Sequence, residues 1–144
     1  GRAILMSKWG ASFTIGYGDT DATGLVYHPN YLYFFEKARI CALIEVARER
    51  GSSLEALLAG CVFVVRSVDI QYLKSLRLGD RCRVESSLQG ASPVRLFWQQ
   101  DMLCCESEQV VCSAKVEVVT LGENGRPRRH PQWLVAYEKE ERFV

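Results

Sequence analysis

The chain has 144 residues, a length that suits one domain with a single hydrophobic core and is too short for two. Acidic and basic residues nearly balance at a net charge of +1, which argues against a nucleic-acid-binding protein with a broad basic face. The composition is typical of soluble globular proteins, and the longest apolar runs are too short to span a bilayer. Residues 1–8 lack the features of a signal peptide, so we expect a cytoplasmic protein with a flexible N-terminal segment.

The six cysteines lie mostly within apolar runs and show no Cys-x-x-Cys spacing, so we expect buried, reduced thiols. The two histidines, His28 and His130, have no cysteine partners at the spacing of metal ligands. We therefore expect no metal site.

In the first half of the chain the apolar pattern changes from that of a strand to that of a helix. Trp9–Tyr17 alternates apolar with small or polar residues, which predicts a strand with one buried face. Residues 29–50 carry a wide apolar stripe that includes Cys41 and Ile44, and this predicts a long, largely buried helix that stops at Gly51. A short helical turn is expected at Ser53–Leu58, capped by Ser52 or Ser53.

The second half reads as four long strands separated by short turn signals: Cys61–Lys74, Arg81–Gly90, Val94–Cys105 and Gln109–Leu121. Short turns between long strands predict an antiparallel meander. Only a single curved sheet is available to cover the helix, so residues 1–144 should form one α+β domain with five strands. Residues 122–144 should form a basic tail with a short helix at Gln132–Glu140. A long edge strand is usually hidden by pairing, so we expect at least a dimer.

A polar loop precedes the long helix. Asp19 and Asp21 come before the turn residue Gly24, and Pro29 suits the first helical position, which leaves free N–H groups near His28 and Asn30. Such a helix start attracts negative charge. A nearby carboxylate could then attack or hydrate a carbonyl whose oxygen becomes anionic. The alternative is a plain polar turn in which the Asp side chains bond nearby backbone.

The run Asp19-Thr-Asp21-x-x-Gly24-x-Val26-Tyr27-His28-x-x-Tyr31, followed by Glu36 and Arg39, resembles the signature of the 4-hydroxybenzoyl-CoA thioesterase-like acyl-CoA thioesterases. The similarity extends more loosely to about Thr120 and so covers most of the chain. It implies a hotdog fold and hydrolysis of an acyl-CoA thioester to the free acid and CoA, with no separate cofactor. It also implies a homodimer or homotetramer whose protomers join their sheets and share active sites at the boundary.

Carried over residue by residue, the resemblance implies that Asp21 is the catalytic carboxylate, either as nucleophile or as general base. The helix start at His28 would supply a backbone donor for the thioester oxygen, and the His28 side chain could orient the carbonyl or act as an acid. Substrate contacts are expected from Asp19, Gly24, Val26, Tyr27, Tyr31 and Arg66. For Asp19 the role of a turn residue is favoured, and for Tyr31 and Tyr17 core packing stays equally open.

Coenzyme A is rich in phosphate, so basic residues should lie at the mouth of the site, with candidates Arg66, Lys74, Arg95 and the cluster Arg126, Arg128 and Arg129. Glu36, in an apolar helix, needs a partner such as Arg39 or Arg66, and a catalytic role for it is the lesser alternative. Two other functions stay open: a thioesterase acting on an acyl carrier protein, and a non-catalytic acyl-binding or assembly protein. The presence of Asp21 argues against the latter. The sequence predicts neither the length of the acyl chain nor a preference for aromatic groups.

Overall fold

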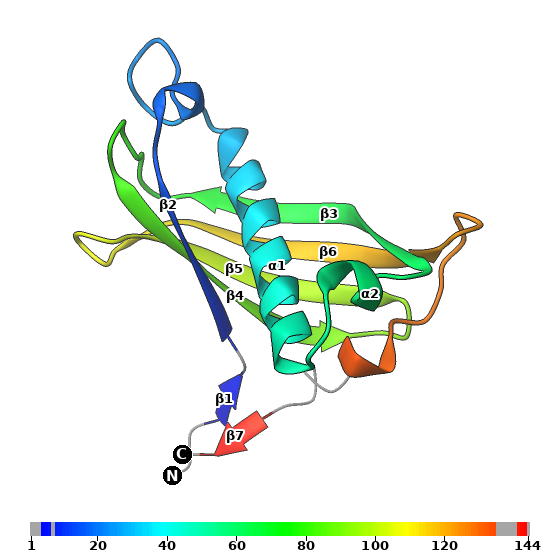
Figure 1. The fold of residues 1–144 in the computed structure, drawn as a ribbon. Coiled ribbons are helices and arrows are strands. Elements are labelled where there is room, and N and C mark those ends of the chain that lie inside the picture. The colour runs from blue at the N-terminus through cyan, green and yellow to red at the C-terminus, as the bar shows by residue number, and fades with distance from the viewer. Residues whose placement is uncertain (1–3, 7, 135–140, 144) are drawn as a thin grey trace.

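The computed structural model describes residues 4–6, 8–134 and 141–143 and has the α+β architecture expected from the sequence. One long helix lies across a curved antiparallel sheet (Figure 1). The elements are β1 (Ile4–Met6), β2 (Lys8–Thr14), a 3₁₀ turn (Tyr17–Asp19), α1 (Asn30–Glu49), α2 (Leu54–Leu57), β3 (Cys61–Tyr72), β4 (Arg81–Ala91), β5 (Arg95–Cys104), β6 (Val110–Gly122) and β7 (Glu141–Phe143).

The main sheet has five strands in the order β2-β4-β5-β6-β3, and every neighbouring pair is antiparallel. Strands β4, β5 and β6 form the expected meander. The prediction was wrong for β3, which pairs with β6 at the edge of the sheet instead of with β4. The reason is that residues 73–80, expected to contain a simple turn, form a crossover along the end of the sheet.

The crossover is fixed by backbone hydrogen bonds at both ends. Leu73 N donates to Val111 O over 2.9 Å, which holds its start beside β6. At its far end Gly79 N donates to Ile15 O over 2.8 Å, and Ile15 N donates to Asp80 O over 2.9 Å. The crossover therefore links the β3 edge of the sheet to the chain that leaves β2.

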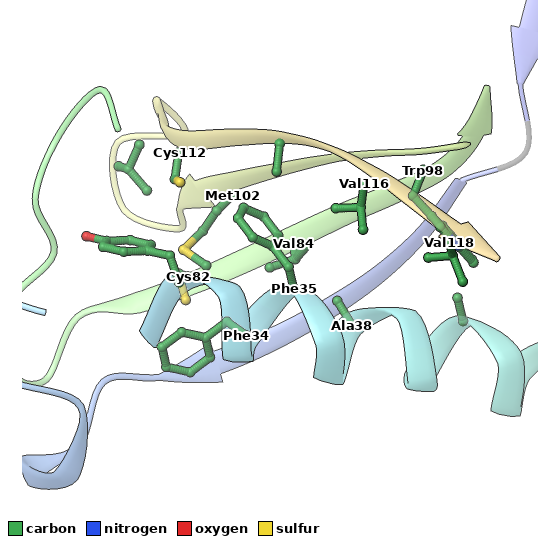
Figure 2. Packing of buried hydrophobic residues seen from close by; sticks show 14 of the residues in the cluster. Phe34, Phe35, Ala38, Cys82, Val84, Trp98, Met102, Cys112, Val116 and Val118 are labelled. Atoms are coloured by element: carbon green, nitrogen blue, oxygen red, sulfur yellow. The ribbon is translucent and has the colours of Figure 1, made fainter. Parts of the chain in front are cut away.

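Helix α1 buries one face against the sheet, at positions three and four residues apart: Tyr31, Phe34, Phe35, Ala38, Ala42, Leu43, Val46 and Ala47. Figure 2 shows part of this core, where α1 meets strand residues that include Val84, Trp98, Met102 and Val116. The sequence stripe also included Cys41 and Ile44, and here it was wrong. Both side chains are exposed, because they lie on the outer face of α1, which no described element covers.

The end of α1 and the start of α2 follow local rules. Gly51 has φ +65°, a left-handed conformation that glycine adopts without strain, and Ser52 N then donates to Ala47 O over 2.9 Å. Ser53 is the residue that caps α2, because its Oγ accepts a hydrogen bond of 3.1 Å from Ala56 N.

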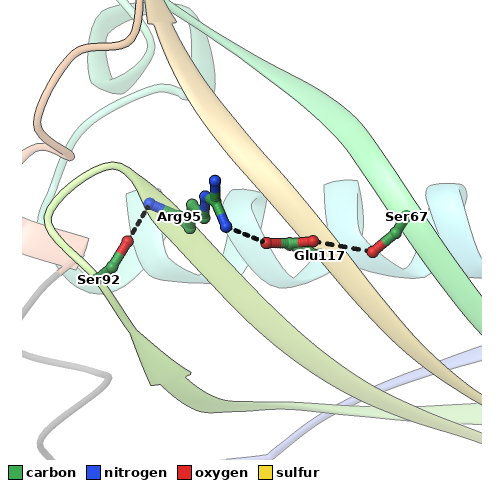
Figure 3. Close-up of polar contacts among 4 residues, drawn as sticks. All are labelled: Ser67, Ser92, Arg95 and Glu117. Carbon is green, nitrogen blue, oxygen red and sulfur yellow. Dashed lines mark hydrogen bonds and ion pairs between the residues drawn. The ribbon is translucent and has the colours of Figure 1, made fainter.

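The sheet face that points away from α1 carries polar side chains. Arg95 pairs with Glu117 over 3.1 Å, and Glu117 also accepts a hydrogen bond of 2.9 Å from Ser67, so these contacts cross β5, β6 and β3 (Figure 3). Ser92 Oγ accepts a hydrogen bond from the Arg95 backbone N–H over 3.1 Å. The apolar layer of the domain therefore lies between α1 and the sheet.

Near the chain ends β1 and β7 form a two-stranded antiparallel sheet that the sequence did not predict, with Ile4 opposite Phe143. Of the terminal helix expected at Gln132–Glu140, residues 132–134 are helical and residues 135–140 lie outside the described part of the chain. All six cysteines are free in the structure. Three are buried (Cys61, Cys82 and Cys112), two are half-buried (Cys104 and Cys105) and Cys41 is exposed.

Candidate active site

The polar loop lies between the end of β2 and the start of α1 (Figure 1). The Asp19 carbonyl oxygen accepts two hydrogen bonds across the loop, from Tyr27 N over 3.0 Å and from Asn30 Nδ2 over 2.9 Å. Val26 N donates to Leu76 O of the crossover over 2.9 Å. The crossover and the helix start therefore fix the position of the loop.

The two carboxylates of the loop make different contacts. Asp19 Oδ2 accepts a hydrogen bond of 2.8 Å from Gly16 N, which fits the turn role that was favoured for it. Asp21 Oδ1 accepts hydrogen bonds from Thr23 N over 2.8 Å and Thr23 Oγ1 over 2.5 Å, and the backbone amide of Leu25 also favours the ionised carboxylate. The Thr23 hydroxyl, followed by its backbone amide, lowers the pKa of the Asp21 carboxyl below its ordinary value. Asp21 is thus an exposed, ionised carboxylate.

Gly24 closes the turn that presents Asp21. Its φ of +80° is left-handed, and its N–H donates to Asp21 O over 3.1 Å. A side chain at this position would strain the backbone, so glycine is the residue that the turn requires.

The start of α1 offers fewer free donors than the sequence suggested. Asn30 N is not free, since it donates to Tyr27 O over 2.8 Å, and Pro29 forms the N-cap one residue before the helix instead of its first residue. The N–H of His28 is different, because it has no acceptor within the part of the chain that the structure describes. His28 is an exposed residue, and its N–H is the donor that the helix start can offer to an anionic oxygen.

Tyr72, at the end of β3, contacts the carbonyl and the ring of His28, and sequence reasoning missed it. Its Oη donates to His28 O over 3.3 Å, and its ring centroid lies 6.0 Å from that of His28 in an edge-to-face arrangement. The Tyr72 ring also packs edge to face on Tyr31, with centroids 5.6 Å apart. No pattern in the sequence could show this, because residues 28 and 72 meet only through the crossover and the sheet edge.

The other residues predicted to contact the substrate fall into two groups, one buried and one exposed. Tyr31 and Val26 belong to the core, and Tyr31 Oη accepts a hydrogen bond of 3.2 Å from Leu76 N, while burial raises the pKa of its phenol. Tyr27 is half exposed, with its ring 5.2 Å from that of His28 between centroids. Tyr17 is exposed. Tyr27 therefore borders the loop surface, whereas Val26 and Tyr31 support it from beneath.

The basic residues considered for coenzyme phosphates are partly engaged elsewhere. Arg95 pairs with Glu117 on the far face of the sheet, Arg128 bonds the Gly60 carbonyl, and Lys74 bonds Gln109. The Arg66 side chain, next to the β3 irregularity, is exposed and makes no hydrogen bond or ion pair with the described residues.

A groove of about 770 Å³ runs between α1 and β3. It begins at Leu32 in the first turn of α1, and most of its lining is aliphatic, including Leu43, Leu58, Val64, Val65, Val68 and Val118. Its charged lining residues are Glu36 and Arg39. These two attract one another, but among the described residues neither forms the close ion pair suggested for Glu36.

A long helix laid across one curved antiparallel sheet, with a polar loop at the helix start, defines the hotdog class of proteins. Residues 15–137 match the model of the Thioesterase-like superfamily, and the chain belongs to this family. It is 33% identical over 126 residues to the acyl-CoA thioester hydrolase YbgC of Escherichia coli O6:H1, covering 86% of this chain and 90% of that protein.

Solved structures agree with this membership. The "Probable Thioesterase" of Bartonella henselae is 29% identical with a TM-score of 0.75, covering 87% of this chain and 100% of that one. The 1,4-dihydroxy-2-naphthoyl-CoA thioesterase of Synechocystis has a TM-score of 0.78 at 18% identity, covers 92% and 96% of the two chains, and shows the shared fold. The resemblance seen in the sequence and the prediction of a thioester hydrolase are confirmed.

No helix within the described ranges is long and apolar enough to cross a membrane. The same residues also contain no group of three or more His, Cys, Asp and Glu side chains arranged to hold a metal ion.

Proposed function

We propose that this chain hydrolyses acyl-CoA thioesters with Asp21 as the catalytic carboxylate and the His28 N–H as the donor to the thioester oxygen. The observation that carries the proposal is the pairing, in one loop, of an exposed, ionised carboxylate with a backbone amide that has no acceptor among the described residues. The similarity to YbgC, an acyl-CoA thioester hydrolase, supports the choice of substrate.

Two routes use the same groups. As a nucleophile, Asp21 Oδ2 forms a bond to the acyl carbon and the C–S bond breaks, releasing CoA thiolate; water then hydrolyses the mixed anhydride and regenerates the carboxylate. As a general base, Asp21 takes a proton from the water that attacks the acyl carbon; the C–S bond then breaks, and the proton passes from Asp21 to the departing CoA thiolate, which regenerates the carboxylate. In both routes negative charge develops on the thioester oxygen, where the exposed His28 amide stabilises it. Neither route needs a metal ion or a separate cofactor.

The enzyme acts as a homodimer or a homotetramer, in which two protomers pair through β3. This edge strand has 12 residues, and it exposes four valines, Val62, Val64, Val65 and Val68. A long apolar edge is a template for strand pairing, and a second copy of β3 satisfies its free backbone groups. Arg66 is exposed on the same strand, so its side chain is then available to a coenzyme phosphate at the boundary between the two protomers. The free thiols suit a reducing compartment, as in the cytoplasm.

The test compares Asp21→Asn with Asp19→Asn in a thiol-reactive dye assay on short, long and aromatic acyl-CoA thioesters. Asp21→Asn keeps the size of the side chain but removes its charge, so kcat should fall by roughly two to four orders of magnitude. Asp19→Asn shares the loop and should lose much less, which controls for damage to the loop. Folded Asp21→Asn with near-wild-type turnover, or an equal loss in both variants, would remove Asp21 from the catalytic role.

Activity assays decide between the alternative functions, and sedimentation tests the proposed assembly. An acyl carrier protein thioester is assayed beside the acyl-CoA thioester of the same acyl group. A clear preference for the carrier-protein thioester would identify it, instead of the CoA thioester, as the substrate. Inactivity of the folded wild type on every thioester leaves a non-catalytic acyl-binding role. Sedimentation at micromolar concentration should show a dimer or larger assembly, and a stable monomer contradicts the pairing of β3.

A further inference from the structure

The groove between α1 and β3 contains one cation among its described lining residues, Arg39. Arg39 lies on α1, nine residues after Asn30, which corresponds to about 13 Å along the helix axis. Between Leu32 and Arg39 the opposite wall is formed largely by aliphatic side chains of β3. A partly buried guanidinium therefore lies in a mostly apolar groove that extends to Leu32 in the first turn of α1, with Glu36 as the other charged lining residue.

Gln100 holds this guanidinium in place. The Gln100 side chain is 0% exposed, and its Nε2 donates to Phe35 O and to Ser86 Oγ, each over 2.9 Å. These two acceptors fix the orientation of the amide, so its Oε1 is directed at Arg39 and accepts a hydrogen bond of 3.0 Å from Arg39 Nη1. A neutral amide thus orients the cation without neutralising it.

The charge of Arg39 lacks a close counter-ion. Within the described part of the chain no carboxylate lies within ion-pair distance of it. Glu36, one helical turn earlier, attracts it from a greater distance, and the Glu36 side chain is exposed to solvent. Burial lowers the pKa of Arg39, yet a guanidinium stays charged at any working pH. A desolvated charge without a partner is costly, and an incoming carboxylate would relieve that cost.

We propose that Arg39 binds a carboxylate at the far end of the acyl group, so that the preferred substrates are CoA monothioesters of dicarboxylic acids. The thioester lies at the start of α1, the methylene chain contacts the aliphatic walls, and the terminal carboxylate accepts hydrogen bonds from the guanidinium. The inference rests on the proposed thioesterase function and adds the class of its substrate. Because Arg39 is fixed by Gln100, activity should be highest at one chain length and fall for shorter and longer diacids.

Two alternative roles for Arg39 lead to different outcomes. If it serves only the packing of α1 on the sheet, its loss lowers stability and affects all substrates alike. If an acidic residue of a second copy neutralises it, its loss weakens the assembly and again leaves substrate preference unchanged. The ratio of kcat/KM for a dicarboxylic thioester to that for a plain acyl thioester of equal length separates both roles from carboxylate binding.

The experiment measures that ratio over several chain lengths for the wild type, Arg39→Met and Glu36→Gln, with folding checked by circular dichroism. Methionine fills similar space without charge, so the ratio should fall about ten- to hundredfold in Arg39→Met, the range expected for one charged hydrogen bond. Any general effect of the substitution acts on both substrates alike, so the ratio isolates the interaction with the carboxylate. Glu36→Gln is the matched control on the same helix: it removes a charge that repels the carboxylate, so the ratio should rise.

The results distinguish the inference from the function on which it rests. If the wild type hydrolyses plain acyl-CoA and the ratio stays the same in Arg39→Met, the inference fails while the thioesterase function stands. A wild-type preference for plain acyl or hydroxyacyl thioesters over dicarboxylic ones also overturns it. If the folded wild type hydrolyses no thioester at all, the function itself fails.

Discussion

Gln100 is a buried polar side chain whose removal has a calculable cost. Gln100→Met keeps the side chain's length but removes two neutral hydrogen bonds, to Phe35 O and Ser86 Oγ, and one to the charged Arg39. Neutral bonds contribute about 0.5–1.5 kcal/mol each and a charged one about 1.5–3 kcal/mol. The buried methionine recovers part of this through apolar burial. We expect the free energy of unfolding to fall by about 2–5 kcal/mol.

The charged bond should make Gln100 and Arg39 strongly coupled. In Gln100→Met the guanidinium remains partly buried without its acceptor, whereas Gln100→Met combined with Arg39→Met removes both partners. The double variant should therefore be more stable than the sum of the two single losses predicts, by about 1–3 kcal/mol.

Urea unfolding of the wild type, both single variants and the double variant measures this coupling. Protein concentration must be held constant, because assembly through β3 would make stability depend on it. Single losses that add to within about 0.5 kcal/mol would mean that the two residues act independently, and the role of Gln100 as the group that orients Arg39 would be refuted.

Three further perturbations follow from the site and its surroundings. Tyr72→Phe removes the hydrogen bond to the His28 carbonyl but keeps the ring contacts, so we expect kcat to fall severalfold with KM little changed; an unaltered kcat would show that the bond does not position this peptide. Thr23→Val removes the hydroxyl that most lowers the pKa of Asp21, so an NMR titration of this carboxyl should show a higher pKa than in the wild type. Burial lowers the pKa of His130 in the folded protein, so the folded state binds fewer protons than the unfolded state. The contribution of neutral His130 to stability is therefore complete above about pH 6.5, the ordinary pKa of histidine, and is lost as the pH falls through the lowered pKa. Denaturant unfolding from about pH 7.5 downward should therefore depend less on pH in His130→Gln than in the wild type.

The sequence predicted the elements of the fold well because their patterns are local. The helical period of α1 identified most of its buried face, and the alternation of β2 identified a strand. Cys41 and Ile44 were misplaced because they are apolar residues on a helix face that the described chain leaves uncovered, and apolar character alone does not show which face meets the sheet. The pairing of β3 was missed for a related reason, since turn signals do not distinguish a hairpin from a crossover.

The candidate site was predicted less completely. Its loop was located from one continuous motif, and the turn roles of Asp19 and Gly24 follow from local spacing. Tyr72 and Gln100 could not be found in this way. They reach the loop and α1 from strands, and their contacts depend on register and on the path of residues 73–80.

The same path connects the loop to the edge of the sheet. Tyr72, which contacts the carbonyl and the ring of His28, is the last residue of edge strand β3, and Leu76 of the adjoining crossover bonds both Val26 and Tyr31. An unpaired edge strand frays most easily at its ends. The proposed pairing of β3 with a second copy would therefore stabilise the residue that contacts the carbonyl and the ring of His28. The two proposals together predict that assembly through β3 and binding of the thioester oxygen at His28 are coupled through Tyr72 and the crossover.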